Sequence, residues 1–351
     1  MRFCIMIKLP NGIKIFKGES AFMKKIINIP QNVVDEMLEG IAYCHNDLVE
    51  RTEGFDIIKR KLPKSGKVAI ISGGGSGHEP SHAGFVGEGM LSAAVCGAVF
   101  TSPTPDQVFQ AIKDADEGAG VFMVIKNYSG DIMNFEMAQE MAEMEDIKVD
   151  SIVVDDDIAV EDSLYTQGKR GVAGTILVHK ILGHAAKEGK TLEEIKAIAT
   201  QLVPNIKTIG VALSGATVPE VGKPGFVLGE TEIEYGVGIH GEPGYRKENL
   251  KPSKELAQEL VDKLLSDFER DETDKFAILI NGLGGTPLME QYVFANDVAH
   301  LLEQNNITVD FKKIGSYMTS IEMAGISLTL LKLADAKWLE ALNAPVNTPA
   351  W

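Results

Sequence analysis

The sequence predicts an α/β protein of two domains, whose sheets are largely parallel or mixed and are flanked by helices. Two observations support this fold class. Short apolar runs typical of buried strands alternate with segments whose apolar residues recur at helical spacing. This alternation starts afresh beyond residue 200, and 351 residues exceed the roughly 250–300 at which a single hydrophobic core stops growing.

The first half of the chain shows the alternation most clearly. Thr104 and Pro105 mark a helix start, as N-cap and first helical residue. The expected helices are Asn32–Ala42, Pro105–Asp114, Ile132–Met144, Val172–Ala186 and Leu192–Leu202. The expected strands are Val68–Ser72, Leu91–Cys96, Val121–Ile125 and Ile152–Val154. Strands separated by helices in this way predict a largely parallel sheet.

The second half repeats the pattern after the charged helix that ends near residue 200. Its expected strands are Ile206–Leu213, Glu232–Gly236, Phe276–Ile280, Val309–Ile314 and Ile326–Leu331, and its expected helices are Lys254–Phe268 and Leu288–Leu302. Because no glycine loop follows the charged helix, we place the domain boundary there. The first domain then comprises residues 23–200 and the second residues 201–351.

Residues 1–22 form an N-terminal extension that lacks the apolar centre and small-residue cleavage site of a signal peptide. Met23 is followed by Lys24 and Lys25, as at a natural start, and codons for residues 17–20 can spell a ribosome-binding sequence. We therefore hypothesise that residues 1–22 derive from an upstream start codon. A genuine N-terminal strand or hairpin is the alternative, and the intact mass of the native protein distinguishes the two.

Composition excludes several classes of partner. The formal net charge of −16 disfavours nucleic acids and anionic membranes, which need clustered Lys and Arg. No apolar run approaches the ~18 residues that span a bilayer. Cys4, Cys44 and Cys96 are scattered and lack metal-binding or disulfide spacing, which favours a reducing cytoplasm.

The first candidate binding segment is Gly73–His78, directly after an apolar strand. Its glycines, Gly74 and Gly75 among them, leave backbone that can approach a small ligand closely. A dinucleotide fingerprint fails because its last glycine is replaced by His78. The phosphate-loop pattern before Lys190-Thr191 fails because His184 stands at its first glycine. A self-contained nucleotide site is therefore not expected.

A metal site is also not expected in this chain. His78 and His82 have zinc-helix spacing, but Pro80 between them excludes the helix on which both would ligate one ion. The alternative for His78 is a structural histidine, and that is the favoured reading for His82. The run Asp155–Asp157 could hold Mg²⁺, although a solvated strand end that caps the next segment is favoured.

Two further segments carry candidate catalytic side chains. Asp131 follows a glycine at a strand exit and precedes a helix, so it is equally a helix N-cap or a catalytic carboxylate. Lys126 leaves the same strand and could orient a hydroxyl-rich ligand. His240 lies among the glycines of Gly236–Gly244, where no regular element fits. Its imidazole could add to a ketone, or it could be a turn histidine.

Several long motifs resemble one family. They are SGGGSGHEPSHAGFVGEGML, FTSPTPDQ, IKNYSGDIMNFEMA, VDDDIAVEDSLYTQGKRGVAGT, EYGVGIHGEPG and NAPVNTPAW. In this order they are similar to the substrate-binding K subunits of bacterial dihydroxyacetone kinases. The resemblance runs from about Met23 to the last residue, and the extension 1–22 is its main departure.

The resemblance implies two α/β domains, a homodimer and dihydroxyacetone bound as a hemiaminal on His240. It implies that Asp131 is the general base and that His78 assists it beside the ligand hydroxyls. Gly75, Lys126 and Ser102 fall on ligand-side positions of the family, with Gly74 next to them. Mg²⁺ and ADP or ATP are expected on a nucleotide-binding L subunit, which a phosphohistidine M subunit recharges. Since no nucleotide domain follows the closing motif, we expect the separate-subunit, phosphoenolpyruvate-dependent branch.

Two other functions compete with this reading. A ligand-sensing co-activator paralogue would bind dihydroxyacetone and keep His240 without catalysing transfer. An independent nucleotide-dependent kinase would carry its own phosphate-binding loop, which the failed motifs argue against. Retention of both His78 and Asp131 favours the enzyme over the sensor.

Overall fold

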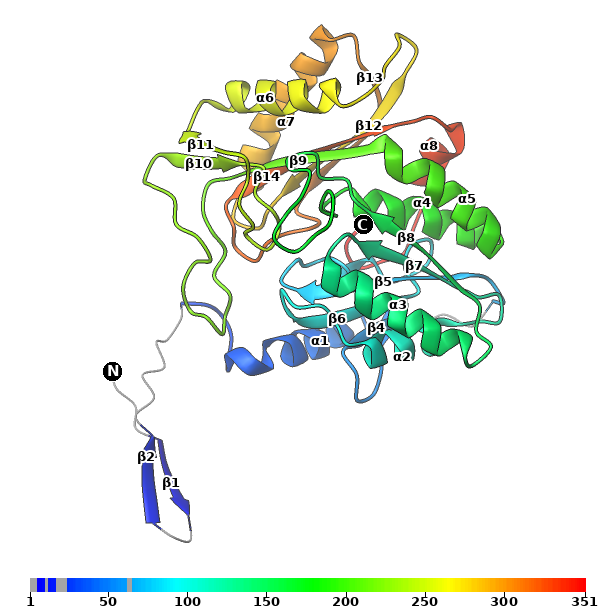
Figure 1. Ribbon diagram of the computed structural model, residues 1–351, viewed down its shortest axis with the longest axis vertical. Helices are drawn as coiled ribbons and strands as arrows, with labels where there is room; N and C mark the ends of the chain where they lie inside the picture. Colours follow the sequence, from blue (N-terminus) through cyan, green and yellow to red (C-terminus); the bar gives the residue numbers. More distant parts are fainter. Residues whose placement is uncertain (1–4, 10–11, 17–23, 62–64) are drawn as a thin grey trace.

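The computed structural model describes residues 5–9, 12–16, 24–61 and 65–351. Its body contains two six-stranded sheets with helices between and outside them (Figure 1). The predicted α/β fold class is thereby confirmed. No helix within the described residues combines the length and the apolar character needed to cross a membrane.

The first sheet is largely parallel. Its strands, in spatial order, are β3 (Val49–Arg51), β4 (Ile57–Arg60), β6 (Ala93–Val99), β5 (Ala69–Ser76), β7 (Val121–Lys126) and β8 (Val149–Val154). The four strands β6, β5, β7 and β8 run parallel, whereas β3 and β4 form an antiparallel hairpin at one edge. The carboxyl ends of β5 and β7 therefore lie side by side, which brings the segments after them together.

The second sheet is mixed. Its spatial order is β11 (Arg246–Asn249), β10 (Glu232–Tyr235), β9 (Ile206–Ala212), β14 (Gly325–Lys332), β12 (Lys275–Gly282) and β13 (Thr308–Gly315). Only β12 and β13 pair in parallel, and the other neighbours are antiparallel. The segment with His240 is the connection between β10 and β11.

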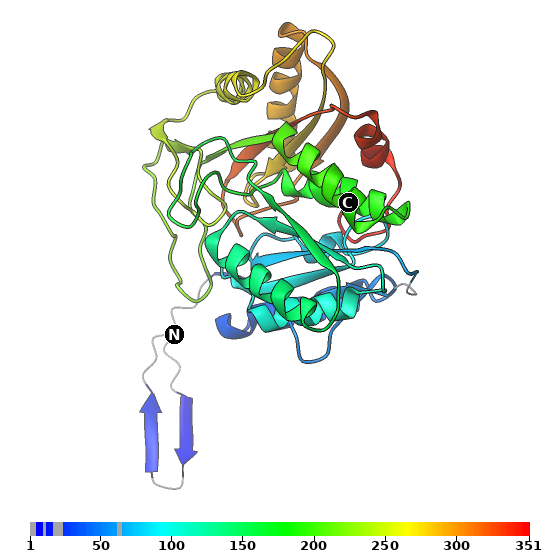
Figure 2. The same ribbon diagram turned by 45° about the vertical axis from the view of Figure 1, so that its right-hand side comes forward.

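The helices form three layers around the sheets (Figures 1 and 2). One face of the first sheet packs on α2 (Pro105–Ala115) and α3 (Ser129–Glu143). One face of the second packs on α6 (Ser253–Ser266) and α7 (Leu288–Gln304). The layer between them comprises α4 (Thr175–Lys187), α5 (Leu192–Leu202) and α8 (Ala336–Asn343), whereas α1 (Val33–Cys44) packs beside β3 and β4 at the edge of the first sheet. Single turns of 3-10 helix occur at Pro30–Asn32, Ala83–Phe85 and Val203–Asn205.

Two expectations about the strand exits need correction. Gly73–Ser76 belong to β5 rather than to a loop, and the glycines are needed there because a Cβ at Gly73 would lie 2.5 Å from the Val95 carbonyl oxygen. Asp131 is not an N-cap, because Tyr128 occupies the N-cap position of α3 and Asp131 lies inside its first turn. The expected N-cap Thr104 is confirmed, and its side chain accepts from the Gln107 amide.

The proposed division at residues 200 and 201 falls within α5, between the last strand of the first sheet and the first strand of the second. It stays a prediction, since the layer between the sheets packs on both of them. In the extension, β1 (Ile5–Leu9) and β2 (Gly12–Phe16) pair as an antiparallel hairpin apart from both large sheets (Figure 2). The proposed start at Met23 lies outside the described residues.

Candidate functional site

Two histidines from the two halves of the chain face each other. His78 follows the carboxyl end of β5, and His240 lies in the β10–β11 connection. Their Nε2 atoms are 3.0 Å apart, which is hydrogen-bond distance. His78 is fully buried, whereas His240 keeps some contact with solvent. The sequence predicted both residues, and the fold brings them together.

The outer ring nitrogens fix the tautomers of this pair. His78 Nδ1 lies 2.7 Å from the Thr319 carbonyl oxygen, which can only accept, so Nδ1 donates. His240 Nδ1 lies 3.1 Å from Glu242 Oε1, and the His240 amide donates to Glu242 Oε2 at 2.9 Å. With a proton on each Nδ1, the contact between the Nε2 atoms is a hydrogen bond only when one further proton lies between them. The pair is thus arranged to hold a single transferable proton.

Charge and burial affect the two ends of the pair differently. Burial would raise the pKa of Glu242, but the hydrogen bond from His240 and the charges of His240 and Arg170 lower it to about 2. Glu242 is therefore a carboxylate that accepts from His240 Nδ1. Burial, followed by the neighbouring His240 and Lys126, lowers the pKa of His78 well below its ordinary value, so a proton placed on its Nε2 is readily given up.

A buried ion pair lies beside the histidines. Lys126, the last residue of β7, places its Nζ 3.2 Å from Asp131 Oδ2, and both side chains are almost completely buried. A Cβ at Gly74 would overlap Lys126 Nζ and lie 3.3 Å from Asp131 Oδ2, so this glycine makes room for the pair. Asp131 Oδ1 is buried and has no hydrogen-bond partner within the described residues. It is therefore free to accept a proton from a ligand hydroxyl.

Aromatic rings enclose His240. Tyr128 meets it edge-on at 4.5 Å between ring centroids, and Phe100 does so at 5.2 Å while stacking on His78 at 5.1 Å. Phe100 has a positive φ of 55°, an uncommon conformation for a bulky residue that recurs at functional sites. A Cβ at Gly75 would lie 2.8 Å from the Phe100 carbonyl carbon, so Gly75 admits this backbone.

All seven residues that the sequence singled out lie around this site. Ser102 approaches the site through Gly130, the residue before Asp131, where an added Cβ would lie 2.8 Å from Ser102 Oγ. Sequence reasoning missed Glu242, Tyr128 and Phe100. Glu242 had a signal, since it follows His240 by two residues within the glycine loop, whereas the two rings carried none.

The other histidine and carboxylate candidates have structural partners. His82 Nδ1 lies 2.9 Å from His179 Nε2 in the core, in accord with its structural interpretation. Asp156 and Asp157 are buried, which corrects the expected solvated strand end. Asp156 accepts from the amides of Val172 and Gly174. Across the described ranges, no three His, Cys, Asp or Glu side chains gather as a metal site would require.

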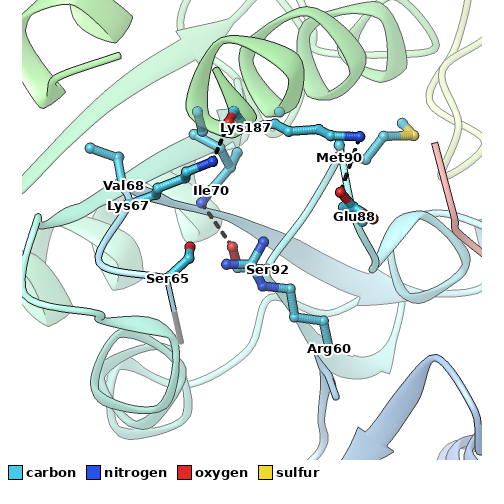
Figure 3. A pocket seen from close by; sticks show the side chains of 12 residues that line it. Arg60, Ser65, Lys67, Val68, Ile70, Glu88, Met90, Ser92 and Lys187 are labelled. Carbon is cyan, nitrogen blue, oxygen red and sulfur yellow. Dashed lines mark hydrogen bonds and ion pairs between the residues drawn. The ribbon is translucent and has the colours of Figure 1, made fainter. Parts of the chain in front are cut away.

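A separate cavity of about 350 Å³ lies near the amino end of β5 (Figure 3). Its basic side chains are already engaged. Lys67 donates to the Lys187 carbonyl oxygen, Lys187 pairs with Glu88 at 3.1 Å, and Arg60 pairs with Glu117 at 2.6 Å. None of the predicted site residues lines this cavity.

Comparison with known proteins agrees with the fold. The family profile described as Dak1 domain matches residues 39–350. The dihydroxyacetone-binding subunit of a PTS-dependent dihydroxyacetone kinase from Lactococcus lactis is 68% identical over 93% of this chain and 99% of its own length. The corresponding subunit of kinase 1 from Listeria innocua is 59% identical, over 94% of this chain and 100% of its own.

Among solved structures, a dihydroxyacetone kinase operon co-activator superposes with a TM-score of 0.85 at 46% identity, covering 90% of this chain and 97% of its own. The match to the family profile extends over most of the chain. The chain therefore belongs to the Dak1 domain family and is a homologue of the dihydroxyacetone-binding subunits of PTS-dependent dihydroxyacetone kinases.

Proposed function

We propose that this chain binds dihydroxyacetone covalently on His240 and presents a terminal hydroxyl for phosphorylation by a nucleotide on a partner subunit. The observation that carries the proposal is the orientation of His240. Glu242 holds its Nδ1 and its backbone amide, while Nε2 faces His78 at 3.0 Å. This arrangement presents one nitrogen for attack and one adjacent group for proton transfer.

In the first step, the lone pair of His240 Nε2 attacks C2 of the ketone. The C–N bond forms as the carbonyl π electrons move to oxygen, and the proton shared with His78 passes to that oxygen. The result is a hemiaminal whose positive imidazolium keeps its Nδ1 proton against Glu242. A ketone can react in this way, whereas glycerol has no carbonyl carbon to attack. The adduct also converts a bimolecular encounter into a positioned one.

In the second step, Asp131 takes the proton of the terminal hydroxyl as that oxygen attacks phosphorus. Its unpartnered, buried Oδ1 supports this role, and Lys126 at 3.2 Å holds Oδ2 in place. General-base assistance of this kind contributes about 10²–10⁴-fold to rate. The remainder of phosphoryl transfer depends on positioning and charge stabilisation, which we assign mainly to the partner.

The proposal assigns Mg²⁺ and the resident ADP or ATP to a nucleotide-binding L subunit, which a phosphohistidine M subunit recharges. The failed phosphate-loop motifs and the net charge of −16 support this division. It also includes a homodimer and a cytoplasmic location. The alternative is a dihydroxyacetone-sensing co-activator, and an operon coactivator of L. lactis is 45% identical to this chain. The higher identity to the kinase subunit and the Lys126–Asp131 pair favour the enzyme.

The test is formation of dihydroxyacetone phosphate by the purified chain. It is run with Mg-ATP alone, and then with the cognate nucleotide subunit, its phosphodonor and phosphoenolpyruvate. We expect product only in the second mixture. Product with Mg-ATP alone would mean that this chain has its own nucleotide site. Ketone binding without product in either mixture would favour the co-activator.

A further inference from the structure

Arg170 is the largest fully buried side chain among the described residues, yet it takes no direct part in either step of the proposed reaction. We propose that Arg170, anchored by Asp157, is a positioning residue that clamps the loop carrying His240 and thereby aims Nε2 at the ketone. The inference rests on the proposed function and deepens it, because it names the residue that holds His240 in position to attack.

The clamp joins two segments distant in sequence. Arg170 Nε and Nη2 lie 2.8 and 2.7 Å from Asp157 Oδ2, and Nη2 also donates to the Gly236 carbonyl oxygen at 2.6 Å. The Asp157 amide donates to the Arg170 carbonyl oxygen at 3.0 Å, so both backbone and side chains close this contact. Gly236 is the first residue of the loop that carries His240. The planar guanidinium therefore spans from a fixed carboxylate to the base of that loop.

The same guanidinium approaches the carboxylate that holds His240. A Cβ at Gly238 would overlap Glu242 Oε2 and lie 2.8 Å from Arg170 Nη1, so both groups converge on this one glycine. Gly238 also donates to the Glu242 carbonyl oxygen at 3.0 Å. Arg170 thus acts on the loop at two points, through a hydrogen bond to Gly236 and through its charge near Glu242.

Stability alone does not account for this arrangement. A buried ion pair contributes little net stability, because desolvation offsets its attraction, and apolar residues of similar volume often replace it without loss. Here one guanidinium nitrogen, Nη1, remains buried without a hydrogen-bond partner within the described residues. An arginine retained in such a place is better explained by what it orients, which is the loop of His240.

The clamp leaves the rest of the site untouched. His78 is held by Thr319 and Asp131 by Lys126, and neither contact involves Arg170 or Asp157. Substitution of Arg170 should therefore weaken adduct formation on His240. It should not slow phosphoryl transfer to the adduct that still forms. This separation distinguishes a positioning role from general loss of structure.

The experiment compares wild type, Arg170→Lys and Arg170→Gln, with Arg60→Lys as a matched control. Arg60 also pairs with a carboxylate, Glu117, but near the opposite end of the first sheet. Adduct is measured by carbon-13 NMR of dihydroxyacetone labelled at C2, whose ketone resonance is lost when the carbon becomes tetrahedral. Steady-state kinetics with the charged nucleotide subunit then give KM and kcat.

In Arg170→Lys we expect the equilibrium constant for adduct formation to fall about 10-fold to 100-fold and KM to rise in proportion. Small misplacements of a reacting group cause losses of this size. We expect kcat to stay within about twofold, and Arg60→Lys to match wild type in both measurements. Arg170→Gln should be at least as impaired. Should it fail to fold, Asp157→Asn carries the test, because it removes the anchoring charge at nearly constant volume.

Adduct formation by the folded Arg170 and Asp157 variants at the wild-type level would overturn the inference while leaving the proposed function intact. A fall in kcat with unchanged adduct would overturn it as well, because it would move Arg170 into the transfer step. Absence of adduct in wild type would remove the proposed function and this inference with it.

Discussion

At the scale of single residues, the site depends on the space left by glycines, which have no side chain, as much as on the reactive groups. Gly74 makes room for the Lys126 ammonium, and Gly75 admits the backbone of Phe100. The sequence predicted this glycine-rich segment as site-building, and its glycines lie beside the candidate site residues. Its glycines admit protein atoms from other strands, however, which one sequence cannot reveal because those neighbours come from distant segments.

The sharpest test at this scale is Asp131→Asn. An amide cannot take the hydroxyl proton, so turnover should fall by about 10²-fold or more, while adduct formation on His240 is retained. The measurements are product formation with the complete phosphotransfer mixture and C2-labelled NMR. The matched control is Asp150→Asn, which breaks an ion pair with Lys196 at 2.9 Å elsewhere on the first sheet. Turnover near the wild-type rate in Asp131→Asn would remove the base role.

At the scale of elements, sequence patterns predicted those helices and strands that depend on neighbouring residues alone. Most helices and buried strands were predicted, because each has a periodicity visible in one window of sequence, although strand β4 and helix α8 were missed. Strand β11 was missed, since Arg246–Asn249 contains no apolar residue and lies at a sheet edge. Strand β3 is only three residues long, too short for periodicity. The strand order of the second sheet could not be predicted, because β14 inserts between β9 and β12 by long-range pairing.

Helix capping gives a prediction at this scale. Thr104 and Thr191 each form a capping box, accepting from the amides of Gln107 and Glu194 at 3.4 and 3.2 Å. Thr104→Ala and Thr191→Ala should each lower the free energy of unfolding by about 1 kcal/mol, because one helix amide loses its acceptor. Urea denaturation measures the change. The serine variants, which keep the hydroxyl, should lose much less, and equal losses for alanine and serine would exclude the capping explanation.

At the scale of the whole molecule, one core joins the two sheets. Ile70 of the first sheet and Leu279 of the second belong to the same buried cluster as helix α4. Within it, His82 and His179 contact each other, and one nitrogen of each ring has no hydrogen-bond partner among the described residues. Burial, followed by nearby Lys126, lowers the pKa of His179 to about 3, and burial lowers that of His82 well below its ordinary value.

These histidines predict acid sensitivity with a definite sign. Above about pH 6.5 they are neutral in both folded and unfolded chains and contribute no pH dependence. As the pH falls below 6.5, the unfolded chain binds protons that the folded core excludes, so stability decreases until the folded pKa is reached. Each such histidine contributes about 1.4 kcal/mol per pH unit in this window.

Urea denaturation at pH 7, 6 and 5 checks this prediction. In His179→Gln the unfolded chain should take up about one proton fewer than in wild type over this pH range. The loss of stability per pH unit should therefore be smaller. His300→Gln, on the exposed side of α7, should leave the slope unchanged. Equal slopes for wild type and His179→Gln would contradict the prediction.

The path of the last residues has a consequence for the order of assembly during synthesis. Residues 345–351 return from the second sheet to the first, where Asn347 bridges to Glu88 and Ala350 donates to the Gly84 carbonyl oxygen. Trp351 stacks on Phe311 of β13. A ribosome makes every strand of both sheets before it releases this segment. The Ala83–Gly89 region, only a few residues beyond His78, therefore lacks this contact on the nascent chain until residues 345–351 have been made.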